Sequence, residues 1–263
     1  MPNAVVLAGG RPDPGVAGGV PNKAFAPLLG RSMVEFVLDA LRGAAAVRRI
    51  ALVGPMPLPP SVAAAVDVPV PERGALIENL AAGLAALPDN EPVLAVGADI
   101  PLLTPAAVDA FAAEAAALDA EIVYGIVRRE EVARAFPTVR KTFVRLRDGT
   151  FTGGSLILMS PTAFARARGA VERAIRARKR PWELAGLFGL GTLAGLAAGT
   201  LRIAALERRG TTLTGVRVRA LVCPTPEIAV DVDTAEMLAL VRERLGRDRG
   251  TSTSGHAQRI AGW

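Results

Sequence analysis

The apolar residues of this chain form two patterns that alternate along its first half. Short apolar runs predict strands, and apolar residues at a spacing of three and four predict helices. The run at residues 92–96 does not alternate, which predicts a strand buried on both faces. Strands are predicted at residues 4–7, 49–54, 92–96 and 121–127. Helices are predicted from Ser32, over residues 75–87 and from Thr104. This alternation predicts an α/β fold in which helices cover a mostly parallel sheet.

Two of the helix starts carry specific signals. Ser32 and Glu35 have the spacing of a capping box, in which the two residues satisfy each other's backbone N–H groups. Thr104 precedes Pro105, so we expect the threonine to cap the helix and the proline to take its first position.

The alternation breaks in the second half of the chain. Residues 141–146 and 151–159 have strand character and flank an Asp148-Gly149 turn, which predicts a hairpin. A mainly helical insertion is predicted over residues 161–209. Late strands are predicted at residues 216–222 and 227–230, and a last helix over 234–245.

We expect one domain over residues 1–245, because a chain of 263 residues can bury a full core without a division. From Gly246 onward the composition turns to Gly, Ser, Thr and Arg, which predicts a disordered tail over residues 246–263.

One segment, residues 184–201, carries no charge and has glycines at G-x-x-x-G spacing. Its length is at the lower limit for a helix that spans a membrane. Five of its residues are glycine and two are threonine, and aromatic residues do not flank both ends. These features favour packed helices in a soluble protein, with membrane contact or a partner-helix surface as the alternatives.

Composition excludes several classes of function. A single cysteine, Cys223, allows no disulfide framework and no cysteine zinc cluster. The single histidine, His256, lies in the polar tail, which argues against histidine bases and histidine metal sites. A net charge of +6 favours acidic ligands but is too modest and dispersed to predict nucleic acid binding. The amino terminus has no basic-then-apolar leader, so we expect a cytoplasmic protein.

The first strand runs directly into Ala8-Gly9-Gly10, and Arg11 and Lys23 follow. Two glycines let backbone N–H groups approach a phosphate closely, and a following cation can neutralise its charge. Ligands of open α/β folds bind at this edge of the sheet. The alternative is a surface turn rich in glycine, since neither common phosphate fingerprint is present.

The strand at residues 92–96 leads to Asp99, which a proline turn follows. Mg²⁺ is commonly held by one or two carboxylates together with phosphate oxygens, so Asp99 is a candidate metal ligand. The alternative is an Asx-turn or capping role. The nearby glycine loop favours the metal, because neighbouring parallel strands bring their carboxyl ends together.

Two late aspartates, Asp231 and Asp233, share one side of an extended segment. The run from Asp233 to Glu236 is similar to a capping box, so Asp233 is predicted mainly as a helix cap. Asp231 has no such local role and is the better candidate for the second metal ligand. Asp233 stays open as the alternative ligand.

Together these motifs resemble nucleotidyltransferases with a glycosyltransferase-A-like Rossmann domain, which include the molybdenum cofactor guanylyl- and cytidylyltransferases. That family has L-A-G-G followed by an arginine and a lysine, matched here by residues 7–10, Arg11 and Lys23. Its Arg-Met-Gly before the lysine is absent, and the interval to Lys23 is longer. The family's metal-binding G-D-M-P-L-L segment resembles residues 98–103, with Ala98 before the aspartate in place of glycine. Its late D-x-D-T-P segment resembles residues 231–235, with Ala235 in place of proline.

The resemblance implies a three-layer domain and assigns roles to individual residues. The implied catalytic residues are Lys23, Asp99 and Arg11, and the implied metal ligands are Asp99, Asp231 and Asp233. The implied nucleotide-binding residues are Leu7, Ala8, Gly9, Gly10, Arg11, Lys23, Gly74 and Asn79. The implied acceptor-binding residues are Thr152, Gly153, Gly154 and Ser155, similar to a T-G-G-N loop with serine in place of asparagine. A simple glycine turn near Gly74 and a β-bulge at Gly153-Gly154 are the respective alternatives.

The implied function is Mg²⁺-dependent transfer of a nucleoside monophosphate. A phosphate group of a small acceptor attacks the α-phosphorus of a nucleoside triphosphate, and pyrophosphate leaves. A phosphate is already a nucleophile at neutral pH, so no histidine base is needed. The alternative function is an inactive nucleotide-binding or glycosyltransferase-like protein that acts through its helical segment.

Overall fold

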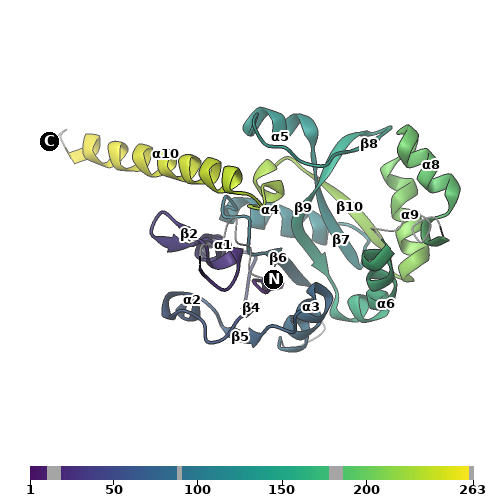
Figure 1. The fold of residues 1–263 in the computed structure, drawn as a ribbon, viewed down its shortest axis with the longest axis horizontal. Coiled ribbons are helices and arrows are strands. Elements are labelled where there is room, and N and C mark those ends of the chain that lie inside the picture. Colours follow the sequence, from purple (N-terminus) through teal and green to yellow (C-terminus); the bar gives the residue numbers. More distant parts are fainter. Residues whose placement is uncertain (11–18, 88–90, 178–185, 261–263) are drawn as a thin grey trace.

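The computed structural model describes residues 1–10, 19–87, 91–177 and 186–260, with side chains up to Arg247. Its core is one sheet with the strand order β10-β7-β9-β6-β1-β4-β5, and β8 pairs with β9 (Figure 1). The strands are β1 (Asn3–Leu7), β4 (Ile50–Gly54), β5 (Val68–Pro71), β6 (Val93–Gly97), β7 (Ile122–Arg128), β8 (Val144–Leu146), β9 (Gly149–Met159) and β10 (Val218–Cys223). A separate small hairpin joins β2 (Pro27–Leu28) and β3 (Arg31–Ser32).

The sheet is mostly parallel, as the sequence predicts. Strands β5, β4, β1 and β6 run parallel to one another, and β10 runs parallel to β7. Strand β9 is antiparallel to both β6 and β7, which it separates. The predicted hairpin is β8 and β9, with Gly149 at the turn. The carboxyl ends of β1 and β6 therefore lie side by side at one edge of the sheet.

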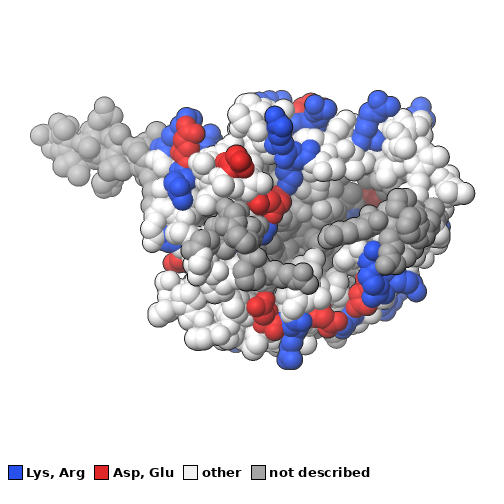
Figure 2. All heavy atoms as spheres, viewed as in Figure 1, with Lys and Arg blue, Asp and Glu red and all other residues white. Residues whose placement is uncertain are grey.

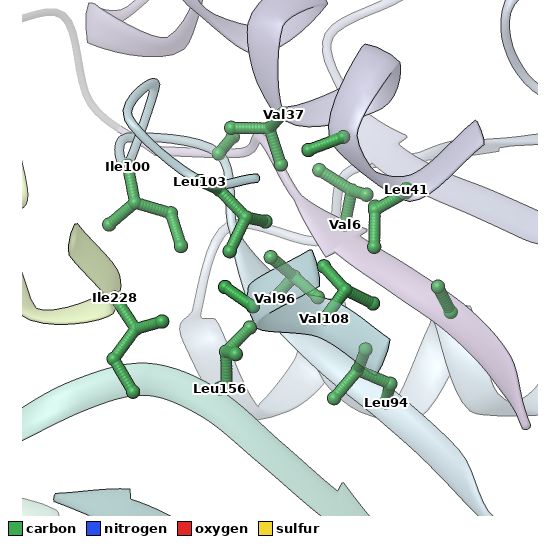
Figure 3. Close-up of a cluster of buried hydrophobic side chains, with 14 of the residues drawn as sticks. Val6, Val37, Leu41, Leu94, Val96, Ile100, Leu103, Val108, Leu156 and Ile228 are labelled. Carbon is green, nitrogen blue, oxygen red and sulfur yellow. The ribbon is translucent and has the colours of Figure 1, made fainter. Parts of the chain in front are cut away.

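Helices cover both faces and make three layers. Successive residues of a strand point to opposite faces, so Val6 packs under α1 (Met33–Gly43) and α4 (Pro105–Ala116) (Figure 3). Val5 packs on the other face, under α3 (Leu76–Ala85) and α6 (Pro161–Ala177). The strands β4 and β6 divide their side chains in the same way. The three-layer α/β architecture is confirmed.

The predicted helix starts are present. The backbone N–H and the hydroxyl of Ser32 both donate to Glu35, at 2.7 and 2.6 Å. The Ala107 N–H donates to Thr104 Oγ1 at 3.2 Å, and Pro105 is the first residue of α4. Short elements that the sequence did not reveal are α2 (Pro60–Ala64), β5, α5 (Arg129–Ala135) and the 3₁₀ turn η1 (Lys23–Phe25).

The strand predicted at residues 227–230 is wrong. This segment forms the 3₁₀ turn η2 (Pro226–Ala229), which places buried Ile228 against the core beside Leu156 (Figure 3). Pro226 has no N–H for a ladder, and the Val230 N–H donates locally to the Glu227 carbonyl at 3.3 Å. The apolar residues are therefore buried without strand pairing.

The insertion is helical where it is described, in α6, α8 (Leu190–Ala198) and α9 (Ile203–Thr214). Residues 178–185 lie outside the described part. In the part of the chain that is described, no helix combines the length and apolar character required to cross a membrane.

The last helix, α10 (Ala235–Ile260), continues beyond residue 245, where the sequence predicts a tail, and projects away from the body (Figure 1). An ion pair at helical spacing, Arg247 with Glu243, accompanies this extension. Over residues 246–260, where the sequence predicts a disordered tail, the backbone is helical.

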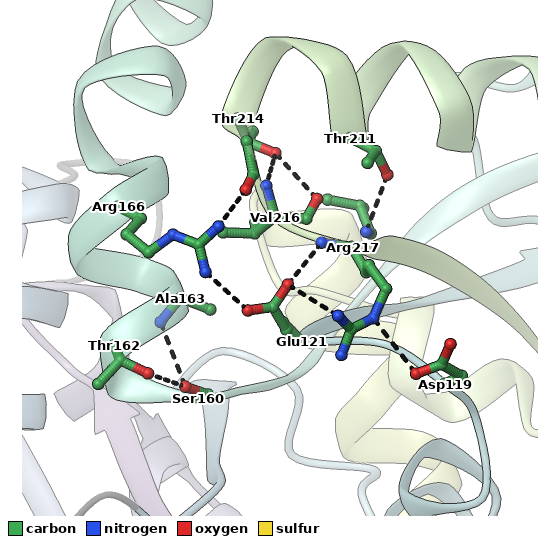
Figure 4. Close-up of polar contacts among 12 residues, drawn as sticks. Asp119, Glu121, Ser160, Thr162, Ala163, Arg166, Thr211, Thr214, Val216 and Arg217 are labelled. Atoms are coloured by element: carbon green, nitrogen blue, oxygen red, sulfur yellow. Dashed lines mark hydrogen bonds and ion pairs between the residues drawn. The ribbon is translucent and has the colours of Figure 1, made fainter.

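A polar network fastens the insertion to the sheet (Figure 4). The carboxylate of Glu121, just before β7, accepts a hydrogen bond from the Arg217 N–H at 2.9 Å and pairs with Arg166 of α6 at 3.0 Å. Arg166 also donates to the Gly215 carbonyl, at the end of α9. The Arg217 N–H, followed by the two arginine charges, lowers the pKa of Glu121. The network thus joins α6, α9 and β7 at one end of the sheet.

Gly83 marks the closest approach of α3 to the sheet. A methyl group added there would lie 2.5 Å from Val5 Cγ1 and 2.9 Å from Val53 Cγ2. We expect Gly83→Ala to lower the free energy of unfolding by about 1–2 kcal/mol, although alanine favours helices. The matched control is Gly169→Ala on α6, where nothing lies within 4 Å, and we expect a gain of about 0.5–1 kcal/mol. Urea denaturation measures both, and a stabilised Gly83→Ala would contradict this packing.

Candidate active site

A cavity of about 610 Å³ opens at the carboxyl ends of β1 and β6. Leu7 and Gly97 are paired at this edge, so the chain that follows each strand enters the same space. Gly9, Gly10, Lys23 and Asp99 line it, together with Leu7 and Ala8. The two motifs that the sequence places at the ends of neighbouring strands are thus brought together. Figure 2 shows this face hollowed near its centre, with mostly uncharged residues in the hollow.

The glycine loop is packed against the segment that leads into α3. A methyl group at Gly9 would lie 2.5 Å from Asn79 Nδ2 and 2.7 Å from Glu72 Oε2, so a larger residue here would displace these two side chains. The Gly10 N–H donates to Glu72 Oε2 at 2.9 Å. An acidic oxygen thus occupies the donor that a phosphate would use. Buried Asn79 also accepts from the Arg73 N–H at 2.5 Å, so it holds the loop rather than lining the cavity.

Asn22 positions the lysine, and sequence reasoning missed it. This buried side chain donates from Nδ2 to the Ala8 carbonyl at 2.8 Å and accepts from the Ala24 N–H at 3.0 Å. Asn22 thereby caps η1 and fixes its start, Lys23, beside the end of β1. The available signal was an asparagine directly before the lysine, which is a common helix cap.

Lys23 lies between two carboxylates. Its Nζ is 2.7 Å from Asp99 Oδ2 and also contacts Asp233 Oδ1. Partial burial lowers the pKa of Lys23, but the attraction of Asp99 and Asp233 outweighs it, so the pKa lies above the usual lysine value. Two carboxylates from distant parts of the chain therefore share one cation.

The late aspartates have other partners than the sequence suggests. Asp233 is not the cap of α10, because the Met237 N–H donates to Thr234 Oγ1 at 3.3 Å. Asp231 pairs with Lys141, a half-buried residue that the sequence did not single out. The Val232 N–H donates to the Asp99 carbonyl at 2.8 Å and ties this segment to the end of β6. The predicted capping role of Asp233 is thus wrong, and Asp233 rather than Asp231 lies with Asp99 at Lys23.

The carboxylates of Asp99 and Asp233 fit Mg²⁺. Mg²⁺ usually takes one or two carboxylates and completes its shell with water and substrate phosphate oxygens. Asp99 and Asp233, which converge on the Lys23 ammonium, could supply the two carboxylate ligands of such a shell. In the described ranges, no cluster of three or more His, Cys, Asp or Glu side chains is arranged to hold a metal ion. A site of this kind would need further oxygen ligands from water or a substrate.

The predicted acceptor residues divide between two cavities. Ser155 of β9 lines the cavity with Lys23, and Thr152 lines a second cavity of about 740 Å³ with Lys141, Asp231 and Asp233. The contact between Lys23 and Asp233 lies where the two cavities approach each other.

Gly153 and Gly154 lie at an irregularity of the sheet. Gly153 pairs with Ile126 and Ile157 pairs with Tyr124, so β9 carries extra residues opposite Gly125. This irregularity is the β-bulge that the glycine pair indicated as an alternative. A methyl group at Gly153 would overlap the Tyr124 hydroxyl, at 1.9 Å, which explains the glycine without any acceptor.

Two further predicted residues contribute less to the geometry. Gly74 has a left-handed conformation (φ +85°) in the turn before α3 and does not line the 610 Å³ cavity, which favours the turn interpretation. Arg11 lies outside the described residues.

Comparisons with known proteins identify the family. The family model for the MobA-like NTP transferase domain matches residues 4–184. A solved structure described as a hypothetical transferase from Thermus thermophilus is 39% identical over 90% of this chain and 100% of its own, with a TM-score of 0.81. A search of curated proteins gave no match.

More distant structures share the fold. A nucleotidyl transferase from Methanothermobacter is 17% identical, with 94% of this chain and 99% of that chain covered and a TM-score of 0.58. CMP:2-keto-3-deoxy-manno-octonic acid synthetase, solved with CTP, is 11% identical. The match covers 94% of this chain and 100% of that chain, with a TM-score of 0.58. The family model match over residues 4–184 shows that the chain belongs to the family of MobA-like NTP transferase domains.

Proposed function

We propose that this protein is an Mg²⁺-dependent nucleotidyltransferase that transfers a nucleoside monophosphate from a nucleoside triphosphate to a small phosphorylated acceptor. The observation that carries the proposal is the convergence of Lys23, Asp99 and Asp233 beside the Gly9-Gly10 loop. A lysine, two carboxylates and a glycine loop at the end of a parallel strand are what a triphosphate with its metal requires.

Each group has a role in this reaction. Asp99 and Asp233 would hold the metal, which neutralises phosphate charge when bound. Lys23 would then exchange its carboxylate partners for triphosphate oxygens. The Gly10 N–H, now paired with Glu72, would become a phosphate donor when that carboxylate moves aside. Catalysis is positioning and charge neutralisation, with no proton transfer at the site.

The covalent step balances without a further reactant. An anionic oxygen of the acceptor phosphate forms a bond to the α-phosphorus of the triphosphate. The bond from that phosphorus to the bridging oxygen breaks, and pyrophosphate leaves with the electron pair. The acceptor oxygen is already deprotonated near neutral pH, because the second pKa of a phosphate monoester is about 6.

The test is a screen of the four common nucleoside triphosphates by thermal shift, with Mg²⁺ and with EDTA, followed by pyrophosphate release with phosphorylated acceptors. We expect at least one triphosphate to raise the melting temperature only with Mg²⁺. Metal-independent binding without pyrophosphate release from any acceptor would instead support an inactive nucleotide-binding protein, for which the Glu72 contact and Ser155 provide a reason.

Lys23→Ala should weaken triphosphate binding selectively. A charge-assisted hydrogen bond is worth about 1.5–3 kcal/mol, so triphosphate affinity should fall roughly ten- to hundredfold while nucleoside affinity barely changes. The matched control is Arg134→Ala, which removes a cation from exposed α5 and should change neither affinity. Calorimetry with both ligands decides, and equal losses for nucleoside and triphosphate would place Lys23 away from the phosphates.

A further inference from the structure

The cavity that contains Lys23 and Asp99 continues as an apolar arm between α3 and α6. Its floor follows one face of β9, where Ser155, Ile157 and Met159 recur at the two-residue period of a strand. Ile157 pairs with Ala95 of β6, and Met159 pairs with Ile122 of β7, so the floor crosses three strands. The wall on the α6 side is formed by Phe164, Val171 and Ile175.

Polar groups are confined to one end of this space. Among the described lining residues, the side chains with polar atoms are Asn22, Lys23, Asp99 and Ser155, all at the carboxyl edge of the sheet. From Ser155 to Met159 the strand advances by about 13 Å, and the side chains along that length are apolar. The cavity therefore has a charged end and an apolar end.

The arm lies on the side of the site away from the predicted nucleotide base. The loop at residues 72–79 leads into α3, which covers β1 and β4. The arm instead lies over β9 and the start of β7. In the strand order, these two strands are on the opposite side of β1 from β4. A nucleotide held by the glycine loop and the turn at residues 72–75 leaves free the floor on β9 and the wall on α6, which belong to the same cavity as Lys23 and Asp99.

Solvent-exposed apolar side chains border the arm. Leu76 of α3 is 58% exposed and Ile175 of α6 is 36% exposed, so a ligand that covers them gains hydrophobic free energy. An ion pair of 2.6 Å between Glu78 and Arg168 joins the two helices. Pockets that bind small molecules commonly combine apolar walls with a few polar groups that fix orientation.

We propose that the acceptor is an amphiphile, with a phosphate at the Lys23 and Asp99 end and an apolar chain or ring system in the arm. This inference rests on the proposed nucleotidyltransferase function, because the transfer reaction requires a phosphorylated acceptor in the same cavity. The arm selects the acceptor by its apolar chain or ring system, whereas the charged end of the cavity positions the reacting phosphate.

The probe is a series of alkyl phosphates, from ethyl to octyl phosphate, titrated below their micellar concentrations and followed by calorimetry. Each methylene buried in the arm should tighten binding by about fourfold, so octyl phosphate should bind at least about a hundredfold tighter than ethyl phosphate. The heat-capacity change should become more negative with chain length. Equal affinity along the series would overturn the inference.

Two variants locate the chain in the arm. Val171→Phe fills the arm from α6, and Ile157→Thr makes its floor more polar while keeping a β-branched residue in the strand. Both variants should lose most of the increase in affinity with alkyl chain length, while their affinity for ethyl phosphate stays unchanged. Lys23→Ala should weaken ethyl and octyl phosphate by the same factor. The control, Leu190→Thr on α8, changes a side chain that is 77% exposed and outside the cavity, and should have no effect.

The same protein preparations separate this inference from the function on which it rests. Mg²⁺-triphosphate binding without dependence on alkyl chain length keeps the proposed function and overturns the amphiphilic acceptor. Chain-length dependence that both arm variants retain also overturns it, because the chain then binds elsewhere. Chain-length dependence that both variants remove, with Mg²⁺-triphosphate binding in the parent, supports the inference. A parent that binds no triphosphate overturns the proposed function and the acceptor role together.

Discussion

Asp99→Asn should abolish the Mg²⁺-dependent stabilisation by a nucleoside triphosphate and lower pyrophosphate release by at least about a hundredfold. The amide keeps the shape of the carboxylate but loses the negative charge that a divalent cation requires. Asp99 is fixed by its neighbours, since its carbonyl accepts from the Val232 N–H at 2.8 Å and its carboxylate pairs with Lys23 at 2.7 Å. The change therefore removes charge without moving the chain.

The fold should survive this substitution. The side chains of Lys23 and Asp99 are 29% and 21% exposed, so their ion pair contributes only about 1 kcal/mol or less to stability. The matched control is Asp119→Asn, at an 88% exposed side chain that pairs with Arg217 and does not line the cavity. Melting temperature with and without Mg²⁺-triphosphate, and pyrophosphate release, decide the matter. An Asp99→Asn protein that still binds Mg²⁺-nucleotide like the parent would remove Asp99 from the metal site.

The sheet could be predicted because its central strands are continuous apolar runs. Residues 4–7, 50–54 and 93–97 are almost all buried between two helical layers, whereas β7 alternates between buried and more exposed positions. The strand predicted at residues 227–230 has a similar composition, and it shows the limit of that signal. Buried Ile228 and Ala229 enter the core on a 3₁₀ turn, so apolar sequence indicates burial there but not the backbone conformation.

Part of the candidate site follows from topology alone. Gly9-Gly10 and Asp99 each end a strand, and parallel neighbours bring such ends together, as β1 and β6 do. The partners Asn22, Glu72 and Lys141 do not follow from topology, because they belong to irregular segments whose contacts depend on the whole fold. Lys141 and Asp231 are 90 residues apart in the chain. A local pattern cannot indicate such a pair.

Asp231 and Asp233 show how a local pattern can give the wrong partner. From the sequence, Asp233 has the position of a helix cap and Asp231 has no local role, so Asp231 is the better ligand. Thr234 takes the capping role instead, at the very next position. The side chains of Asp233 and Thr234 can each accept a hydrogen bond from the first turn of a helix. Which of them caps α10 depends on Lys23, which draws the Asp233 carboxylate toward Asp99.

We therefore expect Asp233→Ser to lose Mg²⁺-dependent triphosphate binding and pyrophosphate release to nearly the extent of Asp99→Asn. Its melting temperature should stay close to that of the parent, because Thr234 still caps α10 and the Asp233 side chain is 58% exposed. Asp231→Ser should behave in the opposite way. It removes the carboxylate that accepts the hydrogen bond of the largely buried Lys141 ammonium, which should cost about 1–3 kcal/mol of stability, while metal dependence is retained.

The comparison of these two variants is informative because the substitutions are chemically identical and only two positions apart. Denaturation, thermal shift with Mg²⁺-triphosphate and pyrophosphate release should be measured on both. If Asp233→Ser is inactive but stable, and Asp231→Ser is destabilised but still responds to Mg²⁺, the second metal ligand is Asp233. The reverse result, an active Asp233→Ser and a dead Asp231→Ser, would place the metal toward Lys141 and the second cavity. Lys23 would then neutralise Asp99 and Asp233 as a structural cation, and the triphosphate would need another partner.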